Sequence, residues 1–248
     1  MPSTTESVCA LGAARRLIAR TRYCSEPADA TAGIAAVGGT KNPDLDAILA
    51  LKPDLVLGNA EENRAEDLEH LAARVPTLVQ TPRTVAEAAV ELRVLASRLG
   101  APGAADPWLD RVDASLREAA AAARGRPPLR VYYAIWRKPW MTVNADTFAH
   151  ALLGQAGGVN VFAANPTRYP EITTEELAAA DPDLVLLCTE PFPFQEKHVE
   201  ELVAATGLPE DRFRIADGEY LSWHGSRTPD GIDYAERLIR GVQLLGHS

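Results

Sequence analysis

The sequence predicts an α/β protein of two lobes, each built on a central parallel sheet, with one long helix joining them. Short aliphatic segments alternate with amphipathic helical patterns along the 248 residues, as is typical of parallel sheets. The segment 52–59 (KPDLVLGN) recurs as 181–188 (DPDLVLLC), so that Asp54 corresponds to Asp183. A repeat this far apart indicates duplicated lobes rather than a solenoid of short repeats.

A long helical pattern over 106–125 lies between the two copies. Asp106 can cap this helix, Pro107 suits its first turn, and Gly125 ends it. At about 1.5 Å per residue the helix spans roughly 27 Å, the size of a small domain. We therefore expect an N-terminal lobe over 1–104, a connecting helix over 105–125 and a C-terminal lobe over 126–248.

The N-terminal lobe is expected to begin with a helix, because a helical pattern opens at the first residues and stops at Gly12. Aliphatic runs and Gly or Pro stops predict the elements that follow. They are a strand at 17–22, a helix at 42–51, a strand at 54–57, a helix at 61–74, a strand at 77–80 and a helix at 84–99.

The C-terminal lobe repeats this alternation of strands and helices. Thr173 and Glu176 form a capping-box pattern at the start of one of its helices. The expected elements are strands at 130–135, 160–163, 184–188 and 213–216, helices at 147–153, 173–180, 196–206 and 231–245, and a loop at 217–230.

The composition limits the possible partners. The formal net charge is −9 and no stripe of Lys and Arg is present, so no nucleic acid partner is expected. No apolar run reaches the roughly 18 residues of a membrane span, so no membrane insertion is expected. Cys9, Cys24 and Cys188 stand in apolar surroundings and are expected to be buried free thiols.

Several stretches, taken in order and spacing, resemble a known family. They are 2–6 (PSTTE), 23–27, the Gly38-Gly39 turn before 45–56, 157–161 (GGVNV) before 184–186, and the last loop with Trp223. They resemble the two-lobed substrate-binding proteins of cobalamin and iron-siderophore import, which are class III periplasmic-binding proteins whose lobes are joined by a rigid helix. Under this resemblance, segment 106–125 is the inter-lobe backbone helix.

The resemblance implies a binding function rather than catalysis. The ligand would be a metal chelate, namely a corrinoid, a ferric siderophore or a haem-like molecule, held in the cleft between the lobes for ABC import or by a soluble carrier. No covalent cofactor and no metal site made by the protein alone are implied. In open α/β sheets, ligands lie at the carboxyl ends of the strands. This placement selects Ser3, Thr4, Tyr23, Asn59, Glu61, Glu62, Asn63 and Arg83 on the first lobe, and Trp136, Arg137, Trp140, Arg168, Tyr169, Glu190, Tyr220, Trp223, His224 and Arg227 on the second.

The sequence departs from the family pattern in two places. The family begins with a strand and an export signal before the PSTTE motif, whereas the sequence as written starts at that motif. For the sequence as written, a cytoplasmic location is therefore expected. If the N-terminus is truncated, a periplasmic or lipoprotein location is expected. If another copy of the chain supplies the missing first strand, the protein would be a dimer. Family members dock on an ABC permease through one acid on each lobe; Glu66 fits the first, but Gly225 and Ser226 stand where the second is expected.

The loop 136–140 (WRKPW) carries the strongest chemical signal. Two indoles and two cations after a strand suit a planar, anionic ligand, through stacking and cation–π contacts of about 1 kcal/mol each. The alternative interpretation is that the two tryptophans only cover the hydrophobic end of the lobe and bind no ligand. His224 can ligate a ligand-borne metal, donate a hydrogen bond, act as a base or merely be solvated.

A bare metal site is not expected from the remaining histidines. His70 and His198 fall on outer helices and are expected to face solvent, His150 lies inside a helix, and His247 is near the end. The alternative function is a cytoplasmic enzyme in which Glu61, Glu62 or His224 acts as acid or base, although hydrolase and phosphate-loop motifs are absent from the sequence. An intracellular ligand sensor is a third possibility.

Overall fold

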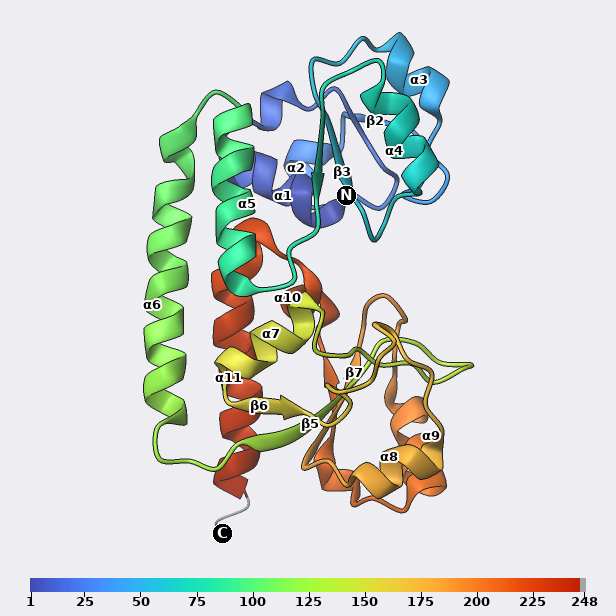
Figure 1. Ribbon diagram of the computed structural model, residues 1–248, viewed down its shortest axis with the longest axis vertical. Coiled ribbons are helices and arrows are strands. Elements are labelled where there is room, and N and C mark those ends of the chain that lie inside the picture. Colours follow the sequence, from blue (N-terminus) through green and yellow to red (C-terminus); the bar gives the residue numbers. More distant parts are fainter. Residues whose placement is uncertain (246–248) are drawn as a thin grey trace. The chain divides into compact units, whose positions relative to one another are not determined.

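The computed structural model describes residues 1–245 and divides the chain into two compact units (Figure 1). Unit 1 comprises 1–82, 86–110 and 224–227. Unit 2 comprises 83–85, 111–223 and the residues from 228 onward. The division falls within α6 (Asp106–Ala123), which is the long helix expected from the sequence.

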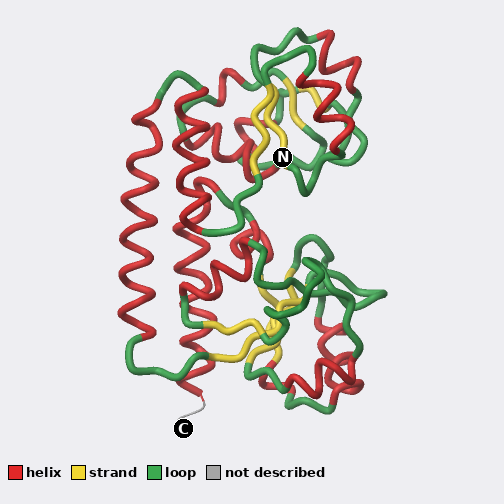
Figure 2. Tube along the Cα trace, in the orientation of Figure 1, coloured by secondary structure: helices red, strands yellow, loops and turns green. Residues whose placement is uncertain are grey.

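Unit 1 contains two separate pairs of parallel strands (Figure 2). In one pair, β1 (Ala19–Arg20) lies beside β2 (Ala35–Ala36), and in the other, β3 (Val56–Asn59) lies beside β4 (Thr77–Gln80). The helical elements are α1 (Pro2–Ala10), η1 (Ala14–Arg16), α2 (Ala28–Thr31), α3 (Leu45–Ala50), α4 (Ala65–Ala72), α5 (Val85–Arg98) and η2 (Pro102–Ala105).

The core of unit 1 lies between α1 and α5. Val8 of α1 and Leu92 and Leu95 of α5 are buried together, and Leu57 of β3 packs against them. The strands themselves are less buried, since β2 is exposed and Val56 and Leu57 are only half-buried. The helices therefore contribute more of this core than the strands do.

Unit 2 holds one parallel sheet of four strands in the order β6-β5-β7-β8. The strands are β5 (Leu129–Ala134), β6 (Gly158–Asn160), β7 (Leu184–Cys188) and β8 (Phe213–Ala216). The helical elements besides α6 are α7 (Phe148–Gln155), α8 (Thr174–Ala180), α9 (Glu196–Thr206), η3 (Glu210–Arg212), α10 (Gly218–Ser222), η4 (Gly225–Arg227, in unit 1) and α11 (Thr228–Leu245).

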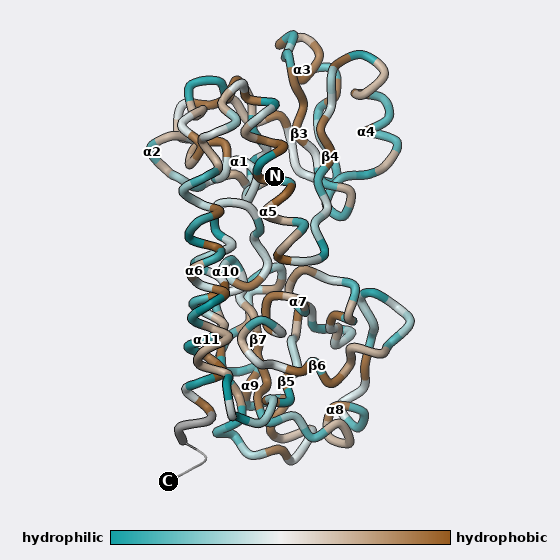
Figure 3. The backbone as a smooth tube through the Cα atoms, turned by 60° about the vertical axis from the view of Figure 1, so that its left-hand side comes forward, coloured by the Kyte–Doolittle hydropathy of each residue, from teal (hydrophilic) through white to brown (hydrophobic). Residues whose placement is uncertain are grey.

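The sequence determines the helix ends of unit 2 through specific caps. Thr173 and Glu176 form the expected capping box of α8, with Thr173 Oγ1 accepting from the Glu176 amide at 3.1 Å. Gly207 ends α9 at φ 69°, a left-handed conformation that favours glycine. Every residue of β7 is buried, as expected for a central parallel strand. Hydrophobic and hydrophilic segments alternate along α6 and α11 in Figure 3.

Most expected elements are confirmed, and the differences concern short elements. Residues 217–230 were expected to be a loop, which was wrong: they contain α10 and η4, and α11 begins at Thr228 rather than at 231. Asp217 caps α10 by accepting from the Glu219 amide at 3.0 Å. The two-residue strand β2 and the single turn α2 have too few residues to show a period.

No helix within residues 1–245 is both long and apolar enough to cross a membrane. Cys24 and Cys188 are buried free thiols, as expected, whereas Cys9 is partly exposed.

Candidate functional site

In unit 1, the loop after β3 is built by two asparagines. Asn59 Oδ1 accepts from the amides of Glu61 and Glu62 at 2.8 and 3.2 Å. The Asn59 amide donates to Asn63 Oδ1 at 2.8 Å, and Asn63 Nδ2 donates to the Thr40 carbonyl at 2.8 Å. The amide side chains of Asn59 and Asn63 therefore hold the loop, in which Glu61 is half-buried and Glu62 is exposed.

The other residues expected on the first lobe differ in accessibility. Tyr23 is 56% exposed, and the Arg22 guanidinium lies 5.6 Å from the centre of its ring. Ser3 and Thr4 of α1 are buried. Arg83 belongs to unit 2, where its guanidinium lies 3.0 Å from Asp146. Of these residues, Tyr23 and Arg83 are exposed, whereas Ser3 and Thr4 are buried.

His224 and Arg227 were expected on the second lobe, but both belong to unit 1. Arg227 forms a bidentate pair with Glu6 of α1, with a shortest distance of 2.6 Å. His224 is only 8% exposed, and desolvation lowers its pKa to about 4. The imidazole is therefore neutral at neutral pH.

In unit 2, the loops after β5 and β7 bring together an aromatic cluster, which we define as Trp136, Trp140, Phe192, Phe194 and His198. Trp140 stacks on Phe194 with ring centres 5.9 Å apart and an interplanar angle of 5°. Trp136 meets Phe192 edge to face at 5.5 Å and is 41% exposed. The loops at the carboxyl ends of two neighbouring parallel strands, β5 and β7, thus carry aromatic side chains, and the Trp136 indole is exposed.

The expectation that His198 faces solvent was wrong. Its ring lies 5.3 Å from Phe192 and 5.6 Å from Phe194, and its Nδ1 accepts from the Gln195 amide at 2.9 Å. This bond caps the start of α9 and holds the ring inside the aromatic cluster, where desolvation lowers its pKa. Phe192, Phe194 and His198 were not predicted as site residues, although the segment 191–194 (PFPF) directly after a strand was an available signal.

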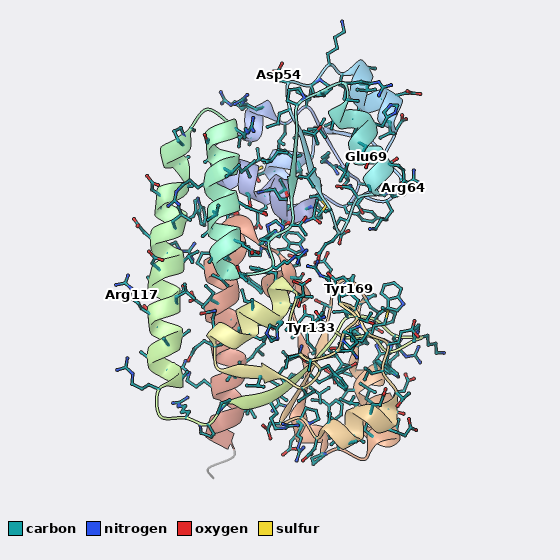
Figure 4. The ribbon with its side chains drawn as sticks, in the orientation of Figure 1. Asp54, Arg64, Glu69, Arg117, Tyr133 and Tyr169 are labelled. Carbon is teal, nitrogen blue, oxygen red and sulfur yellow. The ribbon has the colours of Figure 1, made fainter. Side chains whose placement is uncertain are left out.

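The two arginines expected in the site, Arg137 and Arg168, lie close to carboxylates. Arg137 makes two hydrogen bonds to Glu201, of 2.7 and 2.9 Å, and its guanidinium lies 6.0 Å from the Trp140 ring. Arg168 lies 3.8 Å from Asp146, and its guanidinium is 5.7 Å from the centre of the Tyr169 ring. Figure 4 labels Tyr169 among the loops of this unit and Tyr133 in its sheet.

Three further predicted residues follow strands β7 and β8: Glu190 comes after β7, and Tyr220 and Trp223 come after β8. Trp223 is 7% exposed, and its indole Nε1 donates to Glu190 Oε2 at 2.6 Å. The Tyr220 ring lies 5.2 Å from the ring of Tyr234. Trp223 is therefore packed within unit 2, whereas Trp136 is 41% exposed. Within residues 1–245, no three His, Cys, Asp or Glu side chains gather as a metal site.

These features define a protein of two α/β units whose loops at the carboxyl ends of parallel strands carry the accessible aromatic groups. Comparison with known families is consistent with this class. Residues 1–206 match the family model described as periplasmic binding protein, and the chain belongs to that family.

Individual relatives share less than 30% sequence identity with this chain. The vitamin B12-binding protein of Yersinia pestis (strain Pestoides F) is 28% identical over 191 residues, which are 75% of this chain and 66%, just under two thirds, of that protein. The vitamin B12-binding protein of Photorhabdus laumondii is 27% identical over 190 residues, 75% of this chain and 68% of that protein.

Solved structures support the fold over nearly the whole chain. The periplasmic vitamin B12 binding protein BtuF of Vibrio cholerae superimposes with a TM-score of 0.81 at 21% identity, covering 98% of this chain and 95% of that chain. The periplasmic heme-binding protein BhuT in complex with two hemes superimposes with a TM-score of 0.78 at 26% identity, covering 97% and 96%.

Proposed function

We propose that this protein is a non-catalytic binding protein for a planar metal chelate of the corrinoid or haem type, acting in ABC import or as a soluble carrier. Support comes from the relatives, which are named for vitamin B12 binding, and from the related BhuT structure, which holds two hemes. A ferric siderophore is the third kind of metal chelate expected from the sequence.

The observation that carries the proposal is the exposed Trp136 indole at the edge of the aromatic cluster. Its ring meets Phe192 edge to face and is 41% exposed, so part of an already positioned aromatic group is available for stacking. A preordered ring loses little conformational entropy on binding, and stacking on a macrocycle contributes about 0.5–1.5 kcal/mol. Arg137 lies beside the cluster and adds positive charge, although Glu201 balances it.

Titration of the purified chain with cyanocobalamin, hemin and a ferric hydroxamate siderophore, followed by tryptophan fluorescence, tests the proposal. Trp136→Ala is expected to weaken binding of the preferred chelate by about three- to tenfold. Val159→Ala on β6 is the matched control, because Val159 is also an exposed apolar residue of unit 2 but lies outside the cluster. A folded protein that binds none of the three chelates would refute the proposal.

The alternative, an enzyme using His224 as a base, has less support. Burial lowers the pKa of His224 to about 4, and such an imidazole is a weak base at neutral pH. Docking on a permease would use Glu66 of α4, whose side chain is 68% exposed and lies 3.5 Å from Arg64. Glu66→Lys should then reduce uptake through the transporter without changing chelate affinity.

A further inference from the structure

His198 lies at the centre of the aromatic cluster. Its ring meets Phe192 at 5.3 Å and Phe194 at 5.6 Å, both edge to face, and the two phenylalanine rings lie 4.7 Å from each other. Phe192 in turn contacts Trp136, and Phe194 stacks on Trp140. Each tryptophan of the cluster is therefore connected to His198 through one phenylalanine. The imidazole thus supports both halves of the cluster.

The position of this imidazole depends on a lone pair of Nδ1. His198 is the third residue of α9 (Figure 1), and its Nδ1 accepts from the Gln195 amide at 2.9 Å, while its own amide donates to the Gln195 carbonyl at 2.8 Å. Only 6% of the residue is exposed. Nδ1 can accept a hydrogen bond only while it carries no proton, so this bond exists in the neutral ring alone. The neutral ring then carries its proton on Nε2.

The surroundings of His198 oppose a second proton on the ring. Burial is the main cause that lowers its pKa below the ordinary value of 6.5, and the cations of Lys197 and Arg137 lower it further. Glu201, one turn further along α9, raises the pKa, but this carboxylate is already paired with Arg137 through hydrogen bonds of 2.7 and 2.9 Å. A protonated ring would lose its bond to the Gln195 amide and would face two cations from inside an apolar cluster.

We propose that His198 is a positioning residue of the chelate site: its neutral imidazole holds the aromatic cluster in the arrangement that presents Trp136, and a proton on Nδ1 breaks this arrangement and releases the chelate. The inference rests on the proposed function, because it takes the exposed indole as the surface on which the chelate stacks. Phe192 and Phe194 each lose an edge-to-face contact when the imidazole leaves. Affinity for the chelate is therefore full in the neutral form and falls as the pH drops through the pKa of His198.

The first measurement needs no chelate. The indole N–H signals of Trp136 and Trp140, assigned with Trp136→Phe and Trp140→Phe, are followed by NMR from pH 7.5 to 5.0 together with the imidazole signals of His198. Both indole signals are expected to shift with the midpoint of His198, which lies below pH 6.5, whereas the signal of Trp108 on α6 stays unchanged. Slow hydrogen exchange of the β7 amides over the same range shows that unit 2 remains folded.

The second measurement is the affinity over the same pH range for cyanocobalamin, or for hemin if cyanocobalamin does not bind. Below the midpoint of His198, the native chain is expected to lose affinity by up to about tenfold per pH unit, because binding then requires the release of one proton. His198→Phe keeps a ring in the cluster, and His198→Asn keeps an acceptor for the Gln195 amide. Neither side chain titrates, so both variants should bind with little dependence on pH.

His150→Asn is the matched control for the second measurement. His150 is also a half-buried histidine of unit 2 with a pKa lowered by desolvation, but it lies on α7, outside the aromatic cluster. This variant should keep the pH profile of the native chain. The comparison among the variants also removes any titration of the chelate itself.

Three results would overturn the proposal. Indole signals of Trp136 and Trp140 that do not follow the titration of His198 would show that the imidazole does not hold the cluster. Equal pH profiles of affinity for the native chain, His198→Phe and His198→Asn would show that His198 does not control binding. A chain that binds none of cyanocobalamin, hemin and the ferric siderophore, but whose indoles still titrate with His198, would refute the proposed function and with it the link from the cluster to affinity.

Discussion

The indole nitrogen of Trp223 donates to Glu190 Oε2 at 2.6 Å, which links the loop after β7 to the end of α10. The backbone of Glu190 also lies against Gly218, where an added Cβ would come within 2.6 Å of the Glu190 amide nitrogen. Side chain and backbone of one glutamate thus fix the position of α10.

Replacing the Glu190 side chain removes its hydrogen bond to Trp223 and leaves its backbone contact with Gly218 in place. Glu190→Ala is expected to lower the free energy of unfolding by about 1–3 kcal/mol, because a hydrogen bond to a charged acceptor is lost. Glu190→Gln keeps an acceptor and the backbone contact, so it should cost less. Urea unfolding of unit 2, followed by tryptophan fluorescence, measures both changes, and equal, negligible losses would contradict this role.

The pair Arg227–Glu6 is expected to couple strongly in a double-mutant cycle. Both side chains are largely buried and the pair is bidentate, so we expect a coupling energy of about 1–2 kcal/mol. Arg111–Asp230 is the control: both side chains are nearly half exposed, and its coupling should be below about 0.5 kcal/mol and should shrink in high salt. Similar values for the two pairs would show that burial does not strengthen Arg227–Glu6.

Lowering the pH should destabilise the protein through His224. Its pKa is about 4 when folded and near 6.5 when unfolded, so only the unfolded state takes up the proton between these values. The stability contributed by the neutral ring is full above pH 6.5 and falls toward pH 4, by at most about 1.4 kcal/mol per pH unit. Urea unfolding of the native chain and His224→Asn between pH 7.5 and 4.5 measures it. Parallel pH profiles for the two proteins would exclude His224 as the source.

Gly225 is expected to be intolerant of a side chain. Its φ is 86°, and an added Cβ would lie 2.2 Å from Ser7 Oγ. Gly207 shares the left-handed conformation, at φ 69°, but has open space around it. Gly225→Ala should therefore destabilise the protein by more than the roughly 1 kcal/mol expected for Gly207→Ala. Adding Ser7→Gly should recover part of the difference, and no recovery would refute the clash with Ser7.

The fold could be predicted from the sequence wherever hydrophobic period and end signals agreed. The segments 77–80, 184–188, 196–206 and 213–216 match β4, β7, α9 and β8 residue for residue, because aliphatic runs and Gly or Pro stops define them. The single-turn α2 and two-residue β2 form through tertiary contacts, which periodicity does not reveal.

The candidate site was less predictable because residue type does not determine accessibility. Trp136 and Trp223 are both tryptophans in loops after strands, yet one is accessible and the other is buried on Glu190. Asn59 and Asn63 were predicted as ligand-contacting residues from their place after a strand, and the hydrogen bonds by which their side chains hold the loop could not be predicted from that place. Such differences depend on partners far along the chain, such as Glu6 for Arg227, which no local pattern identifies.

The uneven burial of the three thiols has a practical consequence for spectroscopy. Cys24 and Cys188 have no exposed surface, whereas Cys9 on α1 is partly exposed. A maleimide dye should therefore modify the native protein at Cys9 alone, and slowly, since burial raises the pKa of that thiol. One unmodified polypeptide thus offers a single attachment point in unit 1 for a reporter group, with no engineered cysteine and no thiol to remove.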